Sequence, residues 1–376
     1  MTSSPPSAER RTALRADAGS LYARQLAAAP AAQDYLAARG IPVALARRLG
    51  LGAAGRSWTG AVDQLRARGY TDTELVTSGV AFRSSRGTVV DTFRSRVLFP
   101  AHDEQGVLVG WSGRSTPGAP EQAPRWLNST AGDYRKAELL HGLHEGRVRL
   151  ARGATPVLCE GVLDAHAVTV ATQGACIGLA PGGTALTEQH IAALGRAVTP
   201  HDKDGTAIGR VLVAFDGDDA GRHAAGAAWS LLQAAGAVAS LVTLPAGTDP
   251  SDVGPDVLCA ALCAASPLED LVVDEVLAAW PDRRRFAEHQ VHALRAAAEA
   301  TATLPPDRIG RQVCRIAAAL RLPVTDVTRE VADAASRSTT IRGAGAYAAA
   351  DRWHQTESTS EPPANRLAQR ADPPTA

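Results

Sequence analysis

Five acidic side chains stand where apolar segments of the chain end, a position in which carboxylates can bind metal ions. Glu160 follows one segment directly, with Asp164 four residues further on; Asp216 and Asp218 follow a second, and Asp249 lies after a third. Each alone fits a solvated loop. Grouped together they would repel one another unless they took up protons or a cation. Hard cations such as Mg²⁺ take oxygen ligands, and two of them can assist phosphoryl transfer. The spacing therefore predicts a divalent-metal site for such chemistry.

The surrounding pattern predicts how these carboxylates come together. Near-continuous apolar strands alternate with helices, which is typical of a parallel sheet covered on both faces. In such sheets ligands bind beyond the carboxyl ends of the strands, so the acidic residues should share one edge. The expected strands are 156–159, 175–179, 210–215 and 238–242, and the expected helices are 162–172, 187–194, 219–234 and one from about 252.

The flanking segments differ from this middle part. Residues 80–114 carry short β-type runs that indicate a small antiparallel sheet, preceded by short helices, and Pro-marked helices after 268 indicate a helical bundle. The polar insertion 199–209 is expected to be an exposed loop. We therefore divide the chain into a disordered tail, a basic α+β subdomain, a catalytic α/β domain, a helical subdomain and a second disordered tail, with bounds 1–18, 19–150, 151–266, 267–334 and 335–376.

Composition narrows the class of protein. The formal net charge is zero, but it is a cancellation: residues 1–155 carry 21 Lys and Arg against 13 Asp and Glu, and residues 156–270 carry 4 against 13. No apolar run is long enough to span a membrane and no signal peptide is visible, so a cytoplasmic protein is expected. The five cysteines have no metal-site spacing, and no zinc is expected.

Residues 155–252 resemble the Toprim domain. The resemblance rests on a strand ending in Glu160-Gly161, on Asp164 four residues after the glutamate, and on a strand ending in Asp216-x-Asp218. Toprim domains occur in topoisomerases, primases, recombination mediators and nucleases, so this part alone leaves those functions open.

Further stretches resemble bacterial DnaG-type primases, in the family's order. Residues 183–187 resemble their Gly-Thr-Ala-Leu-Thr and residues 216–222 their Asp-Gly-Asp-x-Ala-Gly-Arg. The upstream matches resemble the primase N-terminal core subdomain and lie at 35–41 (Tyr-Leu-x-x-Arg-Gly), 93–100, 110–114, 124–129, 134–136 and 140–143. The resemblance covers about residues 20–265 and extends to the helices up to about 330. It implies a DNA primase that makes short RNA primers on single-stranded DNA from nucleoside triphosphates, with a replicative helicase as a further partner.

The resemblance also implies roles for individual residues. Glu160, Asp164, Asp216, Asp218 and Asp249 would bind two Mg²⁺ or Mn²⁺ ions, with Glu160, Asp216 and Asp218 catalytic. The template and triphosphate would lie along a basic groove that contains Arg96, Arg114, Arg125, Asn128 and Lys136. Trp111 and Trp126 could stack on a base or sugar, although core packing is the expectation for each alone. His166 and His190 are expected to face solvent or to pack rather than to catalyse.

Three departures from the family's pattern keep alternatives open. Ser251 stands in Asp249-Pro250-Ser251-Asp252 where the family often has a second Asp, and Arg125 stands where it has Lys. No Cys/His set for the family's zinc ribbon is found, which would suit a plasmid, phage or integrative-element form. The alternatives are a metal-dependent Toprim nuclease and a non-catalytic single-stranded-DNA adaptor of a mobile-element replication complex.

Overall fold

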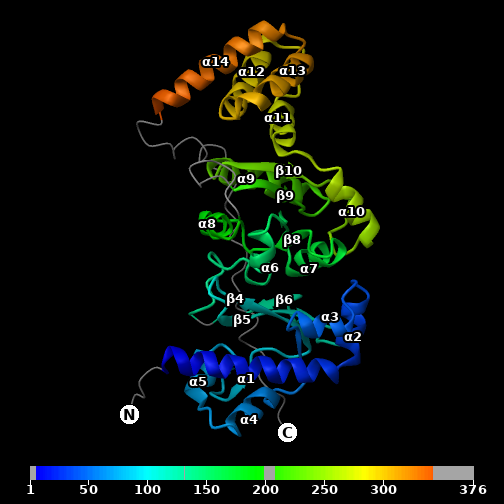
Figure 1. The fold of residues 1–376 in the computed structure, drawn as a ribbon, viewed down its shortest axis with the longest axis vertical. Helices are drawn as coiled ribbons and strands as arrows, with labels where there is room; N and C mark the ends of the chain where they lie inside the picture. Colours follow the sequence, from blue (N-terminus) through cyan, green and yellow to red (C-terminus); the bar gives the residue numbers. More distant parts are fainter. Residues whose placement is uncertain (1–5, 131, 199–207, 342–376) are drawn as a thin grey trace.

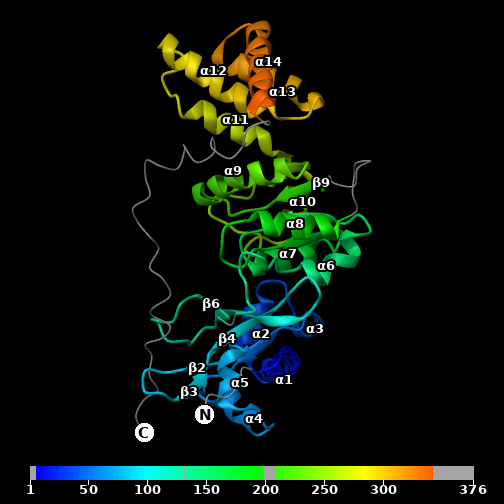
Figure 2. The same ribbon diagram turned by 90° about the vertical axis from the view of Figure 1, so that its left-hand side faces the viewer.

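The computed structural model describes residues 6–130, 132–198 and 208–341. Three parts are stacked along the long axis in sequence order: an N-terminal α+β part, a central sheet with helices, and a helical bundle (Figure 1). The view turned by 90° shows the same order (Figure 2). The predicted architecture, a mainly parallel sheet with flanking helices between a mixed α+β part and a helical part, is therefore confirmed.

The N-terminal part contains a four-stranded antiparallel sheet in the order β1-β4-β5-β6 and a separate β2-β3 hairpin. The β4-β5 hairpin reverses at residues 103–107, as the turn residues there predict. The elements are α1 (Ala8–Ala27), α2 (Pro30–Ala37), α3 (Val43–Arg48), β1 (Gly52–Ala54), α4 (Gly60–Arg66), α5 (Asp72–Thr77), β2 (Ala81–Arg83), β3 (Val89–Asp91), β4 (Arg96–His102), β5 (Leu108–Ser115), β6 (Trp126–Asn128) and α6 (Leu143–Leu150).

Helix α1 corrects the prediction that residues 1–18 are a disordered tail. The helix begins at Ala8, after Ser7, whose side chain accepts a hydrogen bond from the backbone of Arg10. Leu14 and Ala18 are buried on one face, against the sheet. The prediction failed because alanine-rich, arginine-bearing sequence resembles a solvated tail, whereas alanine is frequently a core residue. Residues 1–5 lie outside the described residues.

The central sheet has the strand order β11-β10-β9-β7-β8. Strands β7 to β10 are parallel, and the short β11, which the sequence pattern did not predict, adds antiparallel to β10. The elements are β7 (Thr155–Leu158), α7 (Val162–Ala171), β8 (Cys176–Leu179), α8 (Glu188–Ala197), β9 (Gly209–Val213), α9 (Asp219–Ala234), β10 (Ala237–Leu241), α10 (Pro255–Cys263) and β11 (Ser266–Pro267). The loop predicted at 199–209 lies mostly outside the described residues.

Both faces of this sheet are buried, which explains its apolar strands. Val157 and Leu212 face a core that also contains residues of α7 and α10. Their neighbours Leu158 and Val213 face the opposite core, with residues of α8 and α9. Side chains alternate between the faces of a strand, so a strand covered on both sides must be apolar at consecutive positions.

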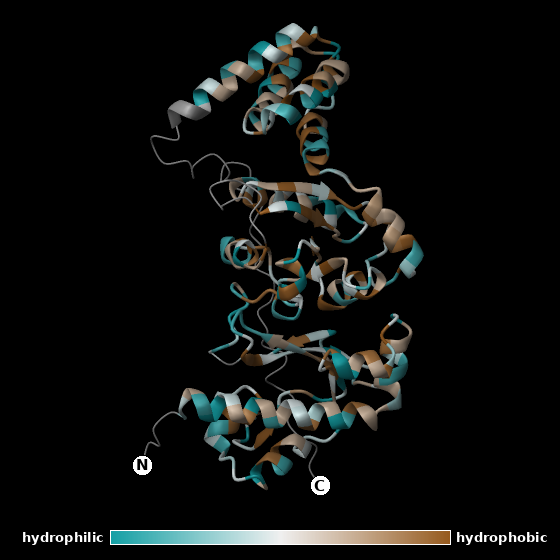
Figure 3. Cartoon of the chain, in the orientation of Figure 1, coloured by the Kyte–Doolittle hydropathy of each residue, from teal (hydrophilic) through white to brown (hydrophobic). Residues whose placement is uncertain are grey.

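The described residues after 267 form α11 (Leu268–Ala278), α12 (Ala287–Ala302), α13 (Pro306–Leu320) and α14 (Val324–Ile341). Helix α11, which carries both hydrophobic and hydrophilic residues (Figure 3), contacts α9 and β10 as well as α12 and α13. Helix α14 corrects the prediction of a disordered tail from 335, because no glycine or proline interrupts the chain between Pro323 and Gly343. Residues 342–376 lie outside the described residues. Within the described ranges, no helix is both long and apolar enough to cross a membrane.

Candidate active site

A cleft of about 410 Å³ lies where the central sheet meets the N-terminal part. Strand β7 pairs with β8 on one side and β9 on the other, so chain connections leave it in opposite directions and open a crevice beyond its carboxyl end. One wall comes from this edge of the sheet and carries Glu160, Asp164, Asp216, Asp249, Ser251 and Asp252. The other comes from the N-terminal part and carries Tyr35, Arg39, Ser112, Arg114, Arg125, Trp126 and Asn128.

Glu160 and Asp216 meet at the crevice. The Oε1 atom of Glu160 accepts a hydrogen bond from the backbone N–H of Asp216 at 3.1 Å, so the strand end of β9 fixes the carboxylate that follows β7. Burial, and then the negative charges of Glu160 and Asp249, raise the pKa of Asp216 to about 6. A carboxyl group whose ionised form is disfavoured by neighbouring carboxylates is one that a cation would stabilise.

Asp164 is the most buried of these acids. It accepts hydrogen bonds from the backbone N–H groups of Gly161 at 3.0 Å and Ser251 at 3.2 Å. Burial first, and then Asp249 and Asp216, raise its pKa to about 8. A Cβ atom on residue 161 would lie 2.6 Å from Asp164 Oδ2, so a glycine is required after Glu160 for this carboxylate to keep its position.

The loop after β10 brings Asp249 into the cleft. Its Oδ1 atom accepts hydrogen bonds from the Ser251 backbone, the Ser251 hydroxyl and the Asp252 backbone, at 2.9, 2.8 and 2.8 Å. Ser251 thus serves the turn, while Asp252 also lines the cleft. The acidic position that the sequence pattern lacks at 251 therefore has a carboxylate one residue later.

Asp218 is placed differently from the other predicted metal ligands. It is exposed, does not line the cleft, and accepts a hydrogen bond from the backbone of Gly221 at 2.8 Å as the N-cap of α9. A Cβ atom on residue 221 would lie 2.2 Å from the backbone oxygen of Asp216, which explains the glycine in this motif. The capping bond fixes the turn that presents Asp216.

The donor set of the acidic wall fits a hard divalent cation. In the described residues no three His, Cys, Asp or Glu side chains already converge closely enough to hold a metal. Nevertheless, Asp164 and Asp216 both have raised pKa values that neighbouring carboxylates help to cause. Oxygen ligands under mutual repulsion are the surroundings that Mg²⁺ or Mn²⁺ relieves.

The opposite wall is cationic and aromatic. The guanidinium of Arg39 lies 4.0 Å from the ring centre of Tyr35, and that of Arg114 lies 5.4 Å from the ring of Trp126. The Tyr35 hydroxyl and the Nε atoms of Arg39 and Arg114 are buried without a hydrogen-bond partner. Buried donors without a partner are costly, so this wall fits a ligand that brings anionic oxygen atoms.

Comparison with known proteins gives a consistent result. Residues 21–147 match the DNA primase catalytic core, N-terminal domain, and residues 157–253 match the Toprim-like family. The chain is 32% identical over 267 residues to a DNA primase of Streptomyces coelicolor, a match that covers 69% of this chain and 40% of that protein. The chain thus spans less than half the length of that relative.

Solved structures agree. The RNA polymerase domain of Mycobacterium tuberculosis primase DnaG superposes with a TM-score of 0.69 at 26% identity, covering 83% of this chain and 99% of that domain. The same domain in complex with a double-stranded DNA oligomer with a 6-nucleotide overhang also gives 0.69, at 27% identity, covering 84% and 98%. This chain belongs to the family of DnaG-type primase catalytic cores.

Not every residue that the primase resemblance assigned to the groove lines the cleft. Arg114, Arg125 and Asn128 do, and the Asn128 amide donates to the backbone oxygen of Gly182 at 2.9 Å. Arg96 is buried and donates to the backbone oxygens of Gly113 and Pro124 at 3.0 and 2.8 Å, so it holds the segment that carries Arg114 and Arg125.

Lys136 is exposed and outside the cleft-lining set. Its backbone oxygen contacts His190 Nε2 at 2.8 Å, and the hydroxyl of Thr187 donates to the backbone of Ala137 at 2.6 Å. The segment 136–137 of this primase core is therefore fixed to the start of α8. These contacts also show that His190 has a packing role.

The aromatic residues divide between core and cleft. Trp111 is buried edge-on to Tyr22, with ring centres 5.3 Å apart, whereas Trp126 lines the cleft. His166 stacks on Phe99 in the interior, with ring centres 5.7 Å apart, which agrees with its expected packing role. The primase motif at 35–41 contains Tyr35 and Arg39, but sequence reasoning did not assign either residue to the groove.

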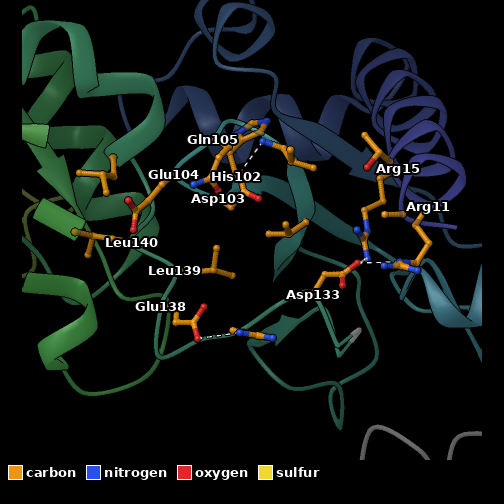
Figure 4. Close-up of a pocket in the computed structure, with 16 residues that line it drawn as sticks. Arg11, Arg15, His102, Asp103, Glu104, Gln105, Asp133, Glu138, Leu139 and Leu140 are labelled. Atoms are coloured by element: carbon orange, nitrogen blue, oxygen red, sulfur yellow. Dashed lines mark hydrogen bonds and ion pairs between the residues drawn. The ribbon is translucent and has the colours of Figure 1, made fainter. Parts of the chain in front are cut away.

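A second cavity of about 500 Å³ lies between α1, the β4-β5 turn and residues 133–143 (Figure 4). Figure 4 shows Arg11 and Arg15 directed at Asp133, and both are within 3.1 Å of its carboxylate. Arg135 similarly pairs with Glu138 at 3.2 Å. These charges are neutralised within the protein, whereas those of the first cleft are separated onto facing walls.

Proposed function

We propose that this chain is a DNA primase that synthesises short RNA primers on a single-stranded DNA template from nucleoside triphosphates. The observation that carries the proposal is the cleft itself, in which a wall of carboxylates at the sheet edge faces a wall of arginines and aromatic rings. Phosphoryl transfer requires this pairing, because negatively charged phosphates must approach catalytic carboxylates.

The acidic wall would hold Mg²⁺ or Mn²⁺ through Glu160, Asp164, Asp216 and Asp249, with Asp252 in place of the acid missing at 251. Such an ion, when bound, offsets charge on the phosphates and lowers the pKa of a bound hydroxyl. Glu160 is the main catalytic carboxylate in this proposal, since the backbone of Asp216 holds it at the strand end. Asp218 acts indirectly in this proposal: it caps α9 and so fixes the turn that positions Asp216.

The basic wall would hold the triphosphate and the template. Arg39, Arg114 and Arg125 offer guanidinium groups for bidentate contacts with phosphate oxygens. Tyr35 and Trp126 offer ring faces on which a base or sugar can stack. The complex of the Mycobacterium tuberculosis domain with DNA supports a nucleic-acid ligand for this chain.

Primer synthesis can be measured directly. The chain, single-stranded DNA, labelled nucleoside triphosphates and Mg²⁺ should give short labelled oligonucleotides. Glu160→Gln and Asp216→Asn each remove a charge at nearly constant volume and should lower the rate about 100-fold or more. Asp256→Asn is a matched control, because Asp256 is an exposed acid of α10 that does not line the cleft.

Three results would contradict the proposal. Wild-type protein that binds DNA and Mg²⁺ but incorporates no nucleotide would favour the adaptor alternative. Metal-dependent cutting of DNA without triphosphates would favour the nuclease alternative. Equal rates for wild type and both cleft variants would show that the acidic wall does not catalyse.

A further inference from the structure

The arginines of the helical bundle fall into two groups. Six of them contact carboxylates, in most cases across the helices: Arg295, Arg308, Arg311, Arg315, Arg329 and Arg337. In the described part of the chain, Arg283, Arg284, Arg285 and Arg321 have no such partner, although Asp282 and Glu288 are near in sequence. Unpaired positive charge is thus gathered in one place.

These four arginines lie at one corner of the bundle. The segment between α11 and α12 carries three of them, and one hydrogen bond from this segment and one from the start of α12 reach the end of α13. Arg284 Nε donates to the backbone oxygen of Ala319 at 3.2 Å, and the Gln290 amide donates to that of Leu320 at 2.8 Å. Arg321 follows immediately, in a left-handed conformation at the end of α13.

A series of rings runs through the same corner. The Arg285 guanidinium lies 5.3 Å from the ring centre of Phe286, which meets His289 edge-on at 5.5 Å. Trp280 lies 5.7 Å from His289 and stacks on His292 at 5.1 Å, with the ring planes 12° apart. The series therefore alternates cation, aromatic and imidazole groups.

Several polar atoms of the corner lack partners. Trp280 Nε1, Arg283 Nε and His289 Nδ1 are buried without a hydrogen-bond partner. Phe286, by contrast, is 43% exposed, and Arg284 and Arg285 are exposed beside it. A large apolar ring kept in solvent beside arginines that have no carboxylate partner is not explained by packing within the bundle.

We propose that this corner, which we call the bundle surface (Trp280, Arg283–Phe286, His289, His292 and Arg321), binds single-stranded nucleic acid. Guanidinium groups that have no carboxylate partner fit phosphates, and the ring faces beside them fit unpaired bases. An acidic protein would satisfy the arginines but would not require the rings. None of these residues lines the catalytic cleft, so the surface is a second contact. The proposal rests on the proposed function only in that the ligand is nucleic acid.

The test is equilibrium binding of the full chain to fluorescent oligo(dT) of 10 and 40 nucleotides, without metal or triphosphates. Arg285→Gln with Arg321→Gln removes two unpaired charges from the bundle surface. We expect the dissociation constant for the 40-mer to rise about five- to tenfold. The slope of log K against log salt should fall by about 1.4, since each of the two phosphate contacts to a single strand contributes about 0.7. The 10-mer should lose less.

The matched control is Arg329→Gln with Arg337→Gln. It lowers the net charge equally, but from arginines that already contact Asp326 and Glu330. Its affinity should stay within about twofold of wild type, because the carboxylate beside each guanidinium lowers the local positive potential. A third variant, Phe286→Ala, should weaken binding of the 40-mer without changing the salt dependence.

An unchanged dissociation constant and salt dependence in the Arg285 and Arg321 variant would overturn the proposal, and so would an equal loss in the control. Wild-type protein that does not bind the 40-mer would overturn it too. Primer synthesis is a separate readout: a chain that binds through the bundle surface but makes no primer would contradict only the proposed function.

Discussion

The position of Asp164 depends both on hydrogen bonds from neighbouring backbone groups and on a neighbouring residue that has no side chain. Two backbone N–H groups hold its carboxylate, and the missing Cβ of Gly161 leaves room for it. Glycine here is therefore a requirement of the acidic wall rather than of the strand. The same holds for Gly221, which packs against the backbone of Asp216.

Gly161→Ala should separate catalysis from folding. The added methyl group would have to displace the Asp164 carboxylate, because the two would lie 2.6 Å apart. A displacement of about 1 Å at a reacting centre can lower the rate about 100-fold. We expect a loss of that order in primer synthesis, with little change in the unfolding temperature. Gly55→Ala is the control, since a Cβ there meets nothing within 4 Å. Equal activity of the two variants would refute this account.

Arg39→Gln should weaken ligand binding. The Arg39 Nε atom is buried at the cleft without a partner, so the variant removes a group free to contact phosphate. A lost charge-assisted hydrogen bond corresponds to about 1.5 kcal/mol, roughly a tenfold rise in the dissociation constant for DNA or the KM for triphosphate. Arg47→Gln, on the exposed end of α3, should change neither. No effect of Arg39→Gln would remove this residue from the groove.

Sequence reasoning located the acids better than the arginines, for a physical reason. The acidic residues follow parallel strands, and the carboxyl ends of parallel strands lie at the same edge of the sheet however the connecting helices pack. The arginines lie on a separate sheet and on loops, where direction depends on tertiary contacts. Arg96 is turned inward to backbone oxygens, and Arg39 reaches the cleft from just beyond the end of α2, far in sequence from the acidic residues. Spacing along the chain cannot encode either outcome.

At the level of elements, Asp91 shows how one strand fixes a helix. It ends β3, is buried, and accepts hydrogen bonds from the backbone N–H groups of Ala61 and Val62 at 2.8 and 2.9 Å. These groups begin α4, where helix N–H groups have no partner within the helix. Asp91 thus caps the helix from another element.

The pKa of Asp91 predicts a pH-dependent stability. Burial raises it from 3.8 to about 6 despite the two hydrogen bonds. The folded state therefore binds the proton more tightly than the unfolded chain. Asp91 contributes stability that is complete below pH 4 and is lost as pH rises through 6, about 3 kcal/mol in all. Urea unfolding at several pH values should show wild type losing stability relative to Asp91→Asn between pH 4 and 6. A constant difference between the two would contradict this prediction.

The elements of the central sheet follow the sequence pattern closely, and the ends of the molecule do not. Helix α9 spans the predicted residues, because apolar periodicity and the Asp218 cap define it. The first part of helix α1 was missed because only Leu14, Arg15 and Ala18 are buried among residues 8–18, which leaves little apolar periodicity there. Strand β11 was missed because two residues carry no periodicity, and its pairing with β10 depends on tertiary contact.

At the level of the whole molecule, the net charge of zero results from a basic N-terminal part and an acidic central part. The excess of basic residues before 155 supplies the arginines of the cleft, and the acidic excess after it supplies the carboxylates. Electrostatic attraction to DNA depends on the local surface, not on the total charge. The protein should therefore bind DNA with strong salt dependence although its isoelectric point is near neutrality.

Arg114→Gln with Arg125→Gln tests this division. If both guanidinium groups contact phosphates, the variant should lower the slope of log K against log salt by about 1.4 for single-stranded DNA. Fluorescence anisotropy across a series of KCl concentrations measures it. A slope equal to that of wild type would show that the basic wall does not hold the backbone. The control is again Arg329→Gln with Arg337→Gln, in which both arginines contact carboxylates.

Helix α11 contributes side chains to two hydrophobic cores. Leu268 and Leu271 pack under the sheet, whereas Val273 and Leu277 pack among the helices that follow. A recombination event that cut the chain before Leu268 would remove Leu268 and Leu271 from the core of the sheet and leave a cavity there. The same two side chains would become exposed to solvent on the separated bundle. The catalytic sheet and the bundle should therefore be inherited and exchanged as one module, so that any strand of nucleic acid touching both meets them at a fixed separation.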